Sequence, residues 1–132
     1  MKFISKFKIK NKLVFVLGGD GLIGKKTVEL FLLHGAKVVS IDKKLQKKNK
    51  LNPNLSFEKI DVSNSANLNK KFNNIISKTG IPDIFINCSY PKTSDWNKNS
   101  FKEIKLNSYK KNVDLHLNSF VWSAKIIADK MK

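Results

Sequence analysis

The sequence predicts an α/β fold in which helices cover both faces of a parallel sheet. Residues 13–17 are five consecutive apolar residues followed by glycines, a pattern typical of a strand buried on both faces. Residues 23–33 are predicted to form a helix that ends near His34 and Gly35, because glycine is the usual residue at a left-handed C-terminal cap. Residues 37–42 are predicted to form a second strand. A strand, a helix and a strand over about thirty residues form a βαβ unit, so the two strands are expected to be parallel.

The middle of the chain continues this alternation. A short helix is predicted within the Lys- and Asn-rich stretch 43–54. A third strand is predicted at 57–61, followed by a helix that ends at 79–82 and has Ser63 or Asn64 as its N-terminal cap. The apolar stripe of that helix consists of Leu68, Phe72, Ile75 and Ile76.

The last part of the chain adds a strand and a long helix. Residues 83–87 are predicted to be a fourth strand, 88–107 a polar loop and 109–131 the final helix. The side chains of this helix expected to face the sheet are Val113, Leu117, Phe120, Val121, Ala124 and Ala128. A second apolar stripe, expected to face away from the sheet, consists of Leu115, Trp122 and Ile126.

Length and charge limit the classes of function. A chain of 132 residues is expected to form a single domain, 1–132. The formal net charge is +16, and all 26 basic residues are lysines. Nucleic-acid binders favour arginine, whose planar fork pairs with phosphates and guanine edges. The charge therefore indicates a solvated lysine surface, and neither a nucleic acid nor a membrane is expected as a partner.

Cysteine usage and the N-terminus favour a cytoplasmic location. The single Cys88 cannot form an internal disulfide, which suits a reducing compartment. Residues 1–8 are basic but lack the continuous apolar run and cleavage site of a signal peptide. No segment approaches the roughly 18 apolar residues that span a bilayer, and no metal site is indicated.

The segment Gly18-Gly19-Asp20-Gly21-Leu22-Ile23-Gly24 lies between a predicted buried strand and a predicted helix. Gly18 can form the tight turn, Gly21 allows the backbone to approach a pyrophosphate, and Gly24 allows the helix to pack on the strand. The helix N-terminus offers free N–H groups and partial positive charge to phosphates. The expected cofactor contacts of this glycine loop are Gly18, Asp20, Gly21, Leu22, Ile23 and Gly24.

Asp42 strengthens the prediction of a dinucleotide site. It ends the second strand, where a carboxylate accepts hydrogen bonds from the adenosine ribose hydroxyls. The same carboxylate repels a 2′-phosphate, so NAD is favoured over NADP, although Lys43 and Lys44 can offset the repulsion. Lys43 is included among the expected cofactor contacts. The alternative interpretation of Asp42 is a solvated residue at the end of a strand.

With these elements in place, the chain resembles the short-chain dehydrogenase/reductase family over nearly its whole length. The glycine loop is similar to the family's nucleotide loop, and Asp61-Val62 resembles the family's pair that contacts the adenine ring. Asn87 resembles the first residue of the family's Asn-Asn-Ala-Gly, which continues here as Cys88, Ser89 and Tyr90. The resemblance implies a Rossmann-like three-layer sheet of order 3-2-1-4, without the family's C-terminal strands, and an NAD site that includes Asp61, Val62, Asn87, Cys88 and Ser89.

Two subgroups of the family share further features with the chain. The G-x-x-G-x-x-G spacing is closer to the extended, sugar-nucleotide-modifying members than to the commoner G-x-x-x-G-x-G. Tyr90-Pro91-Lys92 and the loop through Trp96 are similar to a subgroup associated with bacterial flagellin and nonulosonic-acid sugar biosynthesis. The resemblance implies hydride transfer between nicotinamide and a carbonyl or alcohol, with a sugar derivative as one candidate substrate. A sugar-nucleotide epimerase or dehydratase fragment is an alternative.

The family's active site has an Asn within an Asn-Leu-x-Gly segment of the last predicted helix. The matching residues here are 116–119, so His116 takes the position of that catalytic Asn. A histidine there either holds the water that links the catalytic Lys to solvent or packs against the sheet, and packing is the favoured interpretation.

The family's proton-transfer pair is absent from this chain. The family uses a Tyr and a Lys four residues later, because residues four apart share a helix face and the ammonium then lowers the phenol pKa. Tyr90 is followed four residues later by Ser94, and Tyr109 by Val113. The chain is therefore expected to bind a dinucleotide without activity of its own.

Three functions stay open. The leading one is the cofactor-binding half of an NAD-dependent oxidoreductase, and the second is a binding or regulatory module that does not turn the nucleotide over. The third is a basic nucleic-acid-binding domain. Strand 83–87 is expected to be an unprotected edge, and the family's corresponding last helix takes part in dimer contacts. Both surfaces therefore predict either a homodimer or a complementing chain.

Overall fold

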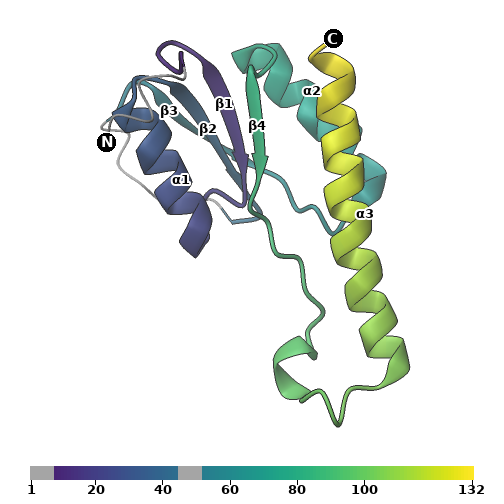
Figure 1. The fold of residues 1–132 in the computed structure, drawn as a ribbon. Coiled ribbons are helices and arrows are strands. Elements are labelled where there is room, and N and C mark those ends of the chain that lie inside the picture. The colour runs from purple at the N-terminus through teal and green to yellow at the C-terminus, as the bar shows by residue number, and fades with distance from the viewer. Residues whose placement is uncertain (1–7, 45–51) are drawn as a thin grey trace.

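A computed structural model describes residues 8–44 and 52–132 as three layers, with a parallel sheet between helices (Figure 1). The strands run in the order β3-β2-β1-β4, and every neighbouring pair is parallel. Their bounds are β1 Leu13–Leu17, β2 Lys37–Asp42, β3 Leu55–Lys59 and β4 Ile84–Asn87. The predicted fold class and strand order are confirmed.

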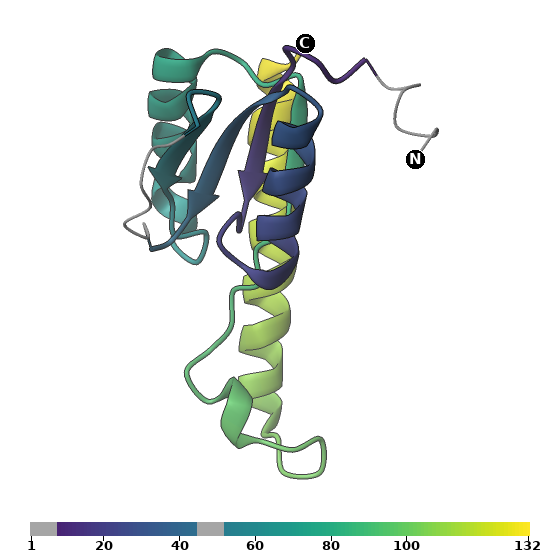
Figure 2. The ribbon, with the colours of Figure 1, turned by 90° about the vertical axis from the view of Figure 1, so that its left-hand side faces the viewer.

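The helices divide between the two faces of the sheet. The helix α1 (Leu22–Leu33) covers one face, while α2 (Leu68–Thr79) and α3 (Leu106–Lys130) cover the other (Figures 1 and 2). Short 3-10 turns, η2 (Ser65–Asn67) and η3 (Trp96–Lys98), precede α2 and α3. The first half of α3 extends past the carboxyl ends of the strands, beside the segment that follows β4 (Figure 2). That segment and α3 therefore form an extension below the sheet.

The central strand β1 is buried on both faces, which explains why its sequence is continuously apolar. Val14 and Val16 pack into the core beneath α1, while Phe15 and Leu17 pack into the core beneath α2 and α3. All four side chains are at most 1% exposed. A strand buried on both faces has no solvent side on which polar residues are tolerated, as the apolar run predicted.

Two elements in the middle of the chain differ from the prediction. The third strand is Leu55–Lys59 rather than 57–61, so Asp61 lies beyond the strand. The second helix begins through η2 with Asn67 as its cap residue, and no side chain makes a capping hydrogen bond. The predicted cap Ser63 instead donates its backbone N–H and its hydroxyl to Asp61. The helix predicted at 43–54 falls largely on residues 45–51, which lie outside the described residues.

The predicted apolar stripe of α2 is confirmed. Leu68, Phe72 and Ile75 are at most 3% exposed, and Ile76 is partly buried against the same core. The ring of Phe72 packs edge-to-face on Phe85 of β4, with 6.1 Å between the ring centroids. The helix α2 therefore packs directly against β4.

The predicted orientation of α3 is wrong. The buried residues of this helix include Ser119, Ser123, Ile126 and Ile127, whereas the predicted sheet-facing residues Val113, Leu117, Phe120, Val121, Ala124 and Ala128 are exposed. Ile126, predicted to face away from the sheet, is only 5% exposed. The two serines are small, so they allow α3 to approach the sheet layer closely. The larger apolar side chains of this helix consequently do not pack on the sheet.

The strand β4 is an edge of the sheet, as predicted: among the described residues, no strand pairs with its outer side. Its start is joined to β1 through Asp83, whose carboxylate accepts hydrogen bonds from Lys12 Nζ (2.7 Å) and Leu13 N (2.8 Å). The hydrogen bond from Lys12 is the largest cause that holds the pKa of Asp83 below its ordinary value. These contacts lie at the amino ends of the strands and leave the carboxyl ends to form the site.

Candidate functional site

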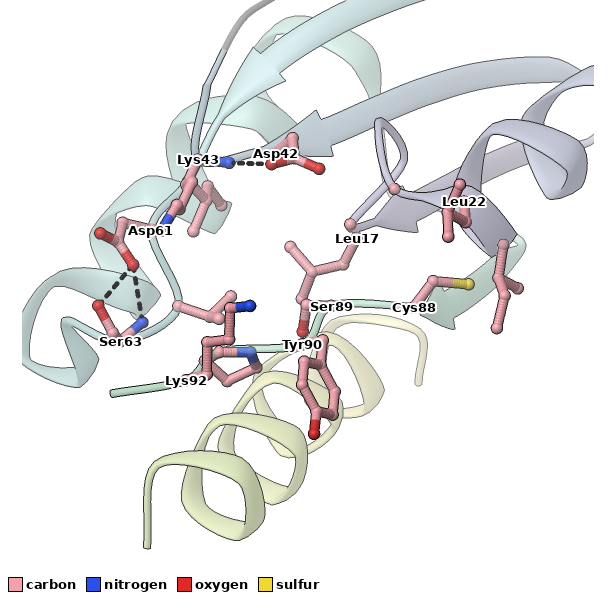
Figure 3. A pocket seen from close by; sticks show the side chains of 16 residues that line it. Leu17, Leu22, Asp42, Lys43, Asp61, Ser63, Cys88, Ser89, Tyr90 and Lys92 are labelled. Carbon is pink, nitrogen blue, oxygen red and sulfur yellow. Dashed lines mark hydrogen bonds between the residues drawn. The ribbon is translucent and has the colours of Figure 1, made fainter. Parts of the chain in front are cut away.

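A cleft of about 670 Å³ lies at the carboxyl ends of the strands (Figure 3). It opens where the chain leaves β1 and β4 toward different faces of the sheet, the place at which parallel α/β sheets bind ligands. Ten predicted cofactor contacts line it: Gly18, Gly21, Leu22, Ile23, Asp42, Lys43, Asp61, Val62, Cys88 and Ser89. The cleft therefore unites residues from the ends of all four strands.

The glycine loop packs tightly on its surroundings. Gly18 has a φ of +77°, and a Cβ on it would lie 2.5 Å from Ser89 N. A Cβ on Gly24 would lie 2.0 Å from Gly18 O, so Gly24 does not line the cleft but lets α1 approach the loop. A Cβ on Gly21 would meet only Gly18 O, at 3.3 Å. Gly18 and Gly24 are thus needed for packing, whereas the position of Gly21 is open toward the cleft.

The helix α1 begins at this loop without a side-chain cap. Gly21 is its N-cap residue, and its first turn contains no acidic residue. Leu22 and Ile23 follow with 93% and 74% of their surfaces exposed. The first turn of α1 therefore presents backbone N–H groups and partial positive charge next to an apolar surface, a combination suited to an anionic ligand with an apolar portion.

Asp42 lies at the end of β2, where its carboxylate organises the loop beside it. Oδ2 accepts a hydrogen bond from Asp20 N (3.1 Å), and Oδ1 accepts one from Lys43 N (2.7 Å). Asp20 does not line the cleft, and its backbone connects the glycine loop to β2. An ionised carboxylate has about four acceptor positions, so Asp42 retains acceptors for hydroxyl donors.

Asp61 lines the neighbouring part of the cleft. Its Oδ1 accepts hydrogen bonds from Ser63 Oγ (2.6 Å) and Ser63 N (3.0 Å), drawn as dashed lines in Figure 3. The hydroxyl of Ser63 is the largest cause that lowers the pKa of Asp61, and the charge of Lys43 contributes in the same direction. Asp61 is therefore a carboxylate at neutral pH, with its charge partly offset by Lys43.

The turn after β4 forms the third wall of the cleft. Asn87 itself does not line the cleft: its Oδ1 accepts hydrogen bonds from Ser89 N (3.0 Å) and Ser89 Oγ (2.6 Å). This turn directs Cys88 and Ser89 into the cleft. The buried Asn87 Nδ2 has no hydrogen-bond partner among the described residues. Asn87 thus holds the turn that forms this wall of the cleft, although its own side chain does not line the cleft.

Sequence reasoning missed six residues that line the cleft: Leu17, Ile60, Ser63, Tyr90, Pro91 and Lys92. Leu17 ends β1 and Ile60 follows β3, so the rule that strand ends line the carboxyl edge of a parallel sheet is a signal for both. Tyr90, Pro91 and Lys92 depend on the path of the chain after β4, for which the sequence holds no local signal.

His116 lies outside this cleft. It lines a second groove of about 390 Å³ together with Tyr90, Trp96, Tyr109, Asn112, Val113, Leu117 and Phe120. Its ring packs edge-to-face on Tyr90 (4.5 Å between centroids) and on Phe120 (6.1 Å), and Nε2 is buried without a hydrogen-bond partner among the described residues. The imidazole therefore packs within an aromatic cluster formed by α3 and the segment after β4, and not against the sheet.

Two negative findings concern the described residues. In 8–44 and 52–132, no group of three or more His, Cys, Asp or Glu residues is arranged to hold a metal ion. No helix in those ranges combines the length and apolar character needed to cross a membrane.

Comparison with known proteins identifies the family. A sequence profile described as short chain dehydrogenase matches residues 12–132. The chain belongs to the short-chain dehydrogenase family. No curated protein matches the sequence.

Several solved structures share the fold. A short chain dehydrogenase from Leptospira borgpetersenii with bound NAD+ has 24% identity and a TM-score of 0.73, over 89% of this chain and 45% of its own. The ligand-free aldohexose dehydrogenase of Thermoplasma acidophilum has 18% identity and a TM-score of 0.75, over 93% and 45%. The protein ElxO with NADPH bound has 23% identity and a TM-score of 0.75, over 92% and 50%. This short-chain dehydrogenase chain thus spans about half the length of these proteins.

Proposed function

We propose that residues 1–132 form one NAD-binding domain of a short-chain oxidoreductase. The observation that carries the proposal is the convergence of the uncapped start of α1, the open position of Gly21 and the Asp42 carboxylate on one cleft. In the proposed complex, α1 and the glycine loop bind the pyrophosphate and Asp42 accepts hydrogen bonds from the adenosine ribose. Bound NAD+ in the Leptospira structure and NADPH in ElxO support a nicotinamide dinucleotide.

The remaining walls suit the other parts of a dinucleotide. Asp61 and Val62 lie beside Asp42 and are proposed to contact the adenine. Cys88 and Ser89 are proposed to lie along the nicotinamide ribose, with the apolar Leu22 and Ile23 next to them. The bound nicotinamide would supply hydride transfer to or from a carbonyl or alcohol, and a sugar derivative is one candidate substrate, suggested by the similarity to two subgroups of the family.

NAD is proposed as the ligand in preference to NADP. The Asp42 carboxylate repels a 2′-phosphate at the ribose it binds. Lys43, the nearest candidate to offset that repulsion, extends toward Asp61 in Figure 3, and its charge already acts on that carboxylate. At the ribose, the 2′-phosphate would therefore lie beside the Asp42 carboxylate and beside a lysine whose charge already acts on Asp61.

The residues of this chain do not supply proton transfer. Tyr90 and Tyr109 are its only tyrosines, and neither is followed four residues later by lysine. His116, at the position that the resemblance matches to the family's catalytic Asn, is half-buried and packs against aromatic rings. We expect the isolated chain to bind the dinucleotide without oxidising or reducing a substrate. A non-catalytic binding or regulatory module is the second candidate.

The two uncovered surfaces are proposed to contact further protein. The outer side of β4 is unpaired among the described residues, and α3 exposes Val121 (56%) and Trp122 (46%). A homodimer or a complementing chain would cover them. Sedimentation of the purified chain tests self-association, and a strictly monomeric, soluble chain at high concentration would contradict the homodimer.

Calorimetric titration with NAD and NADP tests the proposed ligand. The unmodified chain is expected to bind one NAD and to bind NADP more weakly. Asp42→Ala removes the ribose contacts and should weaken NAD binding roughly 10- to 100-fold, as for the loss of one or two hydrogen bonds to a charged group. Asp129→Ala is the matched control, because Asp129 lies near the end of α3 and makes only an exposed ion pair with Lys125 and Lys132.

The possible results separate the parts of the proposal. Tighter binding of NADP than of NAD would contradict the assigned role of Asp42. Equal losses in the Asp42 and Asp129 variants would show that the effect is one of net charge. An unmodified chain that binds neither nucleotide would overturn the proposed function.

A further inference from the structure

The wall of the cleft opposite Asp42 is formed by the segment that follows β4. Lys92 lies on this segment and lines the cleft, and its side chain extends inward from that wall (Figure 3). The adjacent Thr93 is fixed to α3: its backbone N–H donates to Asn112 Oδ1 (3.0 Å), and its hydroxyl accepts from Asn112 Nδ2 (2.7 Å). Asn112 is only 3% exposed. The position of Lys92 is therefore set by a buried contact and not by a free loop.

The remaining walls carry little uncompensated positive charge. Asp42 and Asp61 both line the cleft, and the charge of Lys43 acts on Asp61. The glycine loop offers backbone N–H groups and the partial charge of a helix N-terminus, which amounts to about half an elementary charge. A diphosphate carries two negative charges, so these walls leave it without a full counter-charge.

The ammonium group of Lys92 can supply that counter-charge. Its Nζ donates to Asn97 Oδ1 at 3.2 Å, and this partner is a neutral amide. Within the part of the chain that the structure describes, no carboxylate is recorded within 4.0 Å of Lys92 Nζ, whereas Lys12, Lys26, Lys78, Lys125 and Lys132 each form an ion pair. The ammonium group of Lys92 thus has a neutral partner, and with one hydrogen bond described it has two further N–H donors for another acceptor.

We propose that Lys92 binds the diphosphate of the dinucleotide from the wall opposite the glycine loop. The proposal rests on the proposed function, since it assigns a further contact to the same ligand. The ammonium group exchanges the Asn97 amide oxygen for phosphate oxygens, and a charge-assisted hydrogen bond replaces a neutral one. The diphosphate is then held between backbone N–H groups on one side and a lysine on the other.

Titration with ADP-ribose and with adenosine separates the diphosphate from the rest of the ligand. Lys92→Gln should bind ADP-ribose roughly 3- to 10-fold more weakly, the range between an exposed and a partly shielded ion pair, and should bind adenosine as the unmodified chain does. Lys92→Arg keeps the charge and should retain most of the affinity for ADP-ribose. Added salt should weaken ADP-ribose binding less in Lys92→Gln than in the unmodified chain.

The matched control is Lys98→Gln. Lys98 belongs to η3 on the same segment but does not line the cleft, so its loss changes the net charge equally and should leave both titrations unchanged. Unaltered ADP-ribose binding by Lys92→Gln would overturn the role of Lys92 while leaving the proposed function intact. An equal loss of adenosine binding would also overturn it, because the effect would then lie outside the diphosphate. If the unmodified chain binds neither probe, the proposed function fails and the assignment of Lys92 fails with it.

Discussion

Replacing Gly24 by alanine places a methyl group inside the packed glycine loop. The added carbon would lie 2.0 Å from Gly18 O and 2.8 Å from Gly19 Cα, both backbone atoms that cannot rotate away. Ordinary van der Waals contact begins at 3.4 Å, so α1 and the loop would have to separate by about 1.4 Å. A separation of that size also disturbs the packing of Val28, a buried residue of α1 that contacts the strands.

The expected cost follows from these contacts. Inserting a methyl group into a packed site typically costs 1–3 kcal/mol, and alanine recovers up to about 1 kcal/mol of helix propensity inside a helix. Gly24 lies in the first turn, where little of that gain applies, so the net loss is about 2 kcal/mol. For a domain of this size the melting temperature should fall by roughly 6–10 °C.

Gly21→Ala is the matched comparison within the same loop. Its methyl group would meet only Gly18 O at 3.3 Å, and the φ of −72° suits alanine. The stability of this variant should stay within about 0.5 kcal/mol of the unmodified chain, since the lost cap preference and the reduced freedom of the unfolded chain nearly cancel. Binding of ADP-ribose should nevertheless be lost, because the methyl group occupies the approach of the diphosphate.

Thermal unfolding by circular dichroism measures the first effect and calorimetry the second. A melting temperature of Gly24→Ala equal to that of the unmodified chain would refute the steric argument. A large drop in Gly21→Ala would refute the claim that this position is open. Full ADP-ribose binding by Gly21→Ala would show that the diphosphate does not approach the loop there.

Three further predictions concern the rest of the fold. Asp83→Asn removes the charged partner of Lys12 and should cost roughly 0.5–1 kcal/mol in urea unfolding at neutral pH, a small value because the pair is exposed. Since the folded pKa of Asp83 lies below the unfolded value of about 3.9, that difference should be present above pH 4 and vanish as pH falls through the folded pKa; a constant difference would contradict it. Phe72→Ala removes a fully buried ring packed on Phe85 and should cost about 3–5 kcal/mol in urea unfolding, with a loss below 1 kcal/mol counting against the assigned core. His116→Phe keeps the aromatic packing and removes a buried nitrogen without a partner, so thermal stability should be equal or higher; a clear loss would mean that Nε2 has a partner.

The predictable parts of this molecule are those fixed by residues close in sequence. The apolar run of β1 and the apolar stripe of α2 are local patterns, and another secondary structure at these residues would expose apolar surface. The glycine after α1 is predictable because it adopts the left-handed conformation that ends a helix. The site follows by one further step, because residues that end parallel strands meet at one edge of the sheet. Asp42 was predicted from its place at the end of a strand, whereas Asp61, Cys88 and Ser89 were predicted from the resemblance to the family, and all four line one cleft.

The features that could not be predicted are those for which the local sequence allows two arrangements and contacts elsewhere in the fold decide between them. Ser63 can cap a helix or donate to Asp61, and the preference depends on how the chain leaves β3. The final helix has two apolar stripes, and the close approach that buries Ser119 and Ser123 decides which one faces outward. The position of Lys92 depends on Thr93 and Asn112, nineteen residues apart.

The crowding around Gly18 has a consequence for the history of this sequence. A side chain at that position would meet Ser89 N at 2.5 Å and would have to adopt a φ of +77°. The chain after β1 can therefore contact the turn after β4 this closely only if residue 18 is glycine. A lineage that no longer used a nucleotide would still be expected to retain Gly18, since every other residue separates two strands of the sheet. Gly21 has no such steric constraint, so substitutions at this position would be tolerated once nucleotide binding is no longer needed. Among descendants of this chain, a retained Gly18 would therefore indicate only that the protein folds, whereas a retained Gly21 would indicate that the protein still binds a nucleotide.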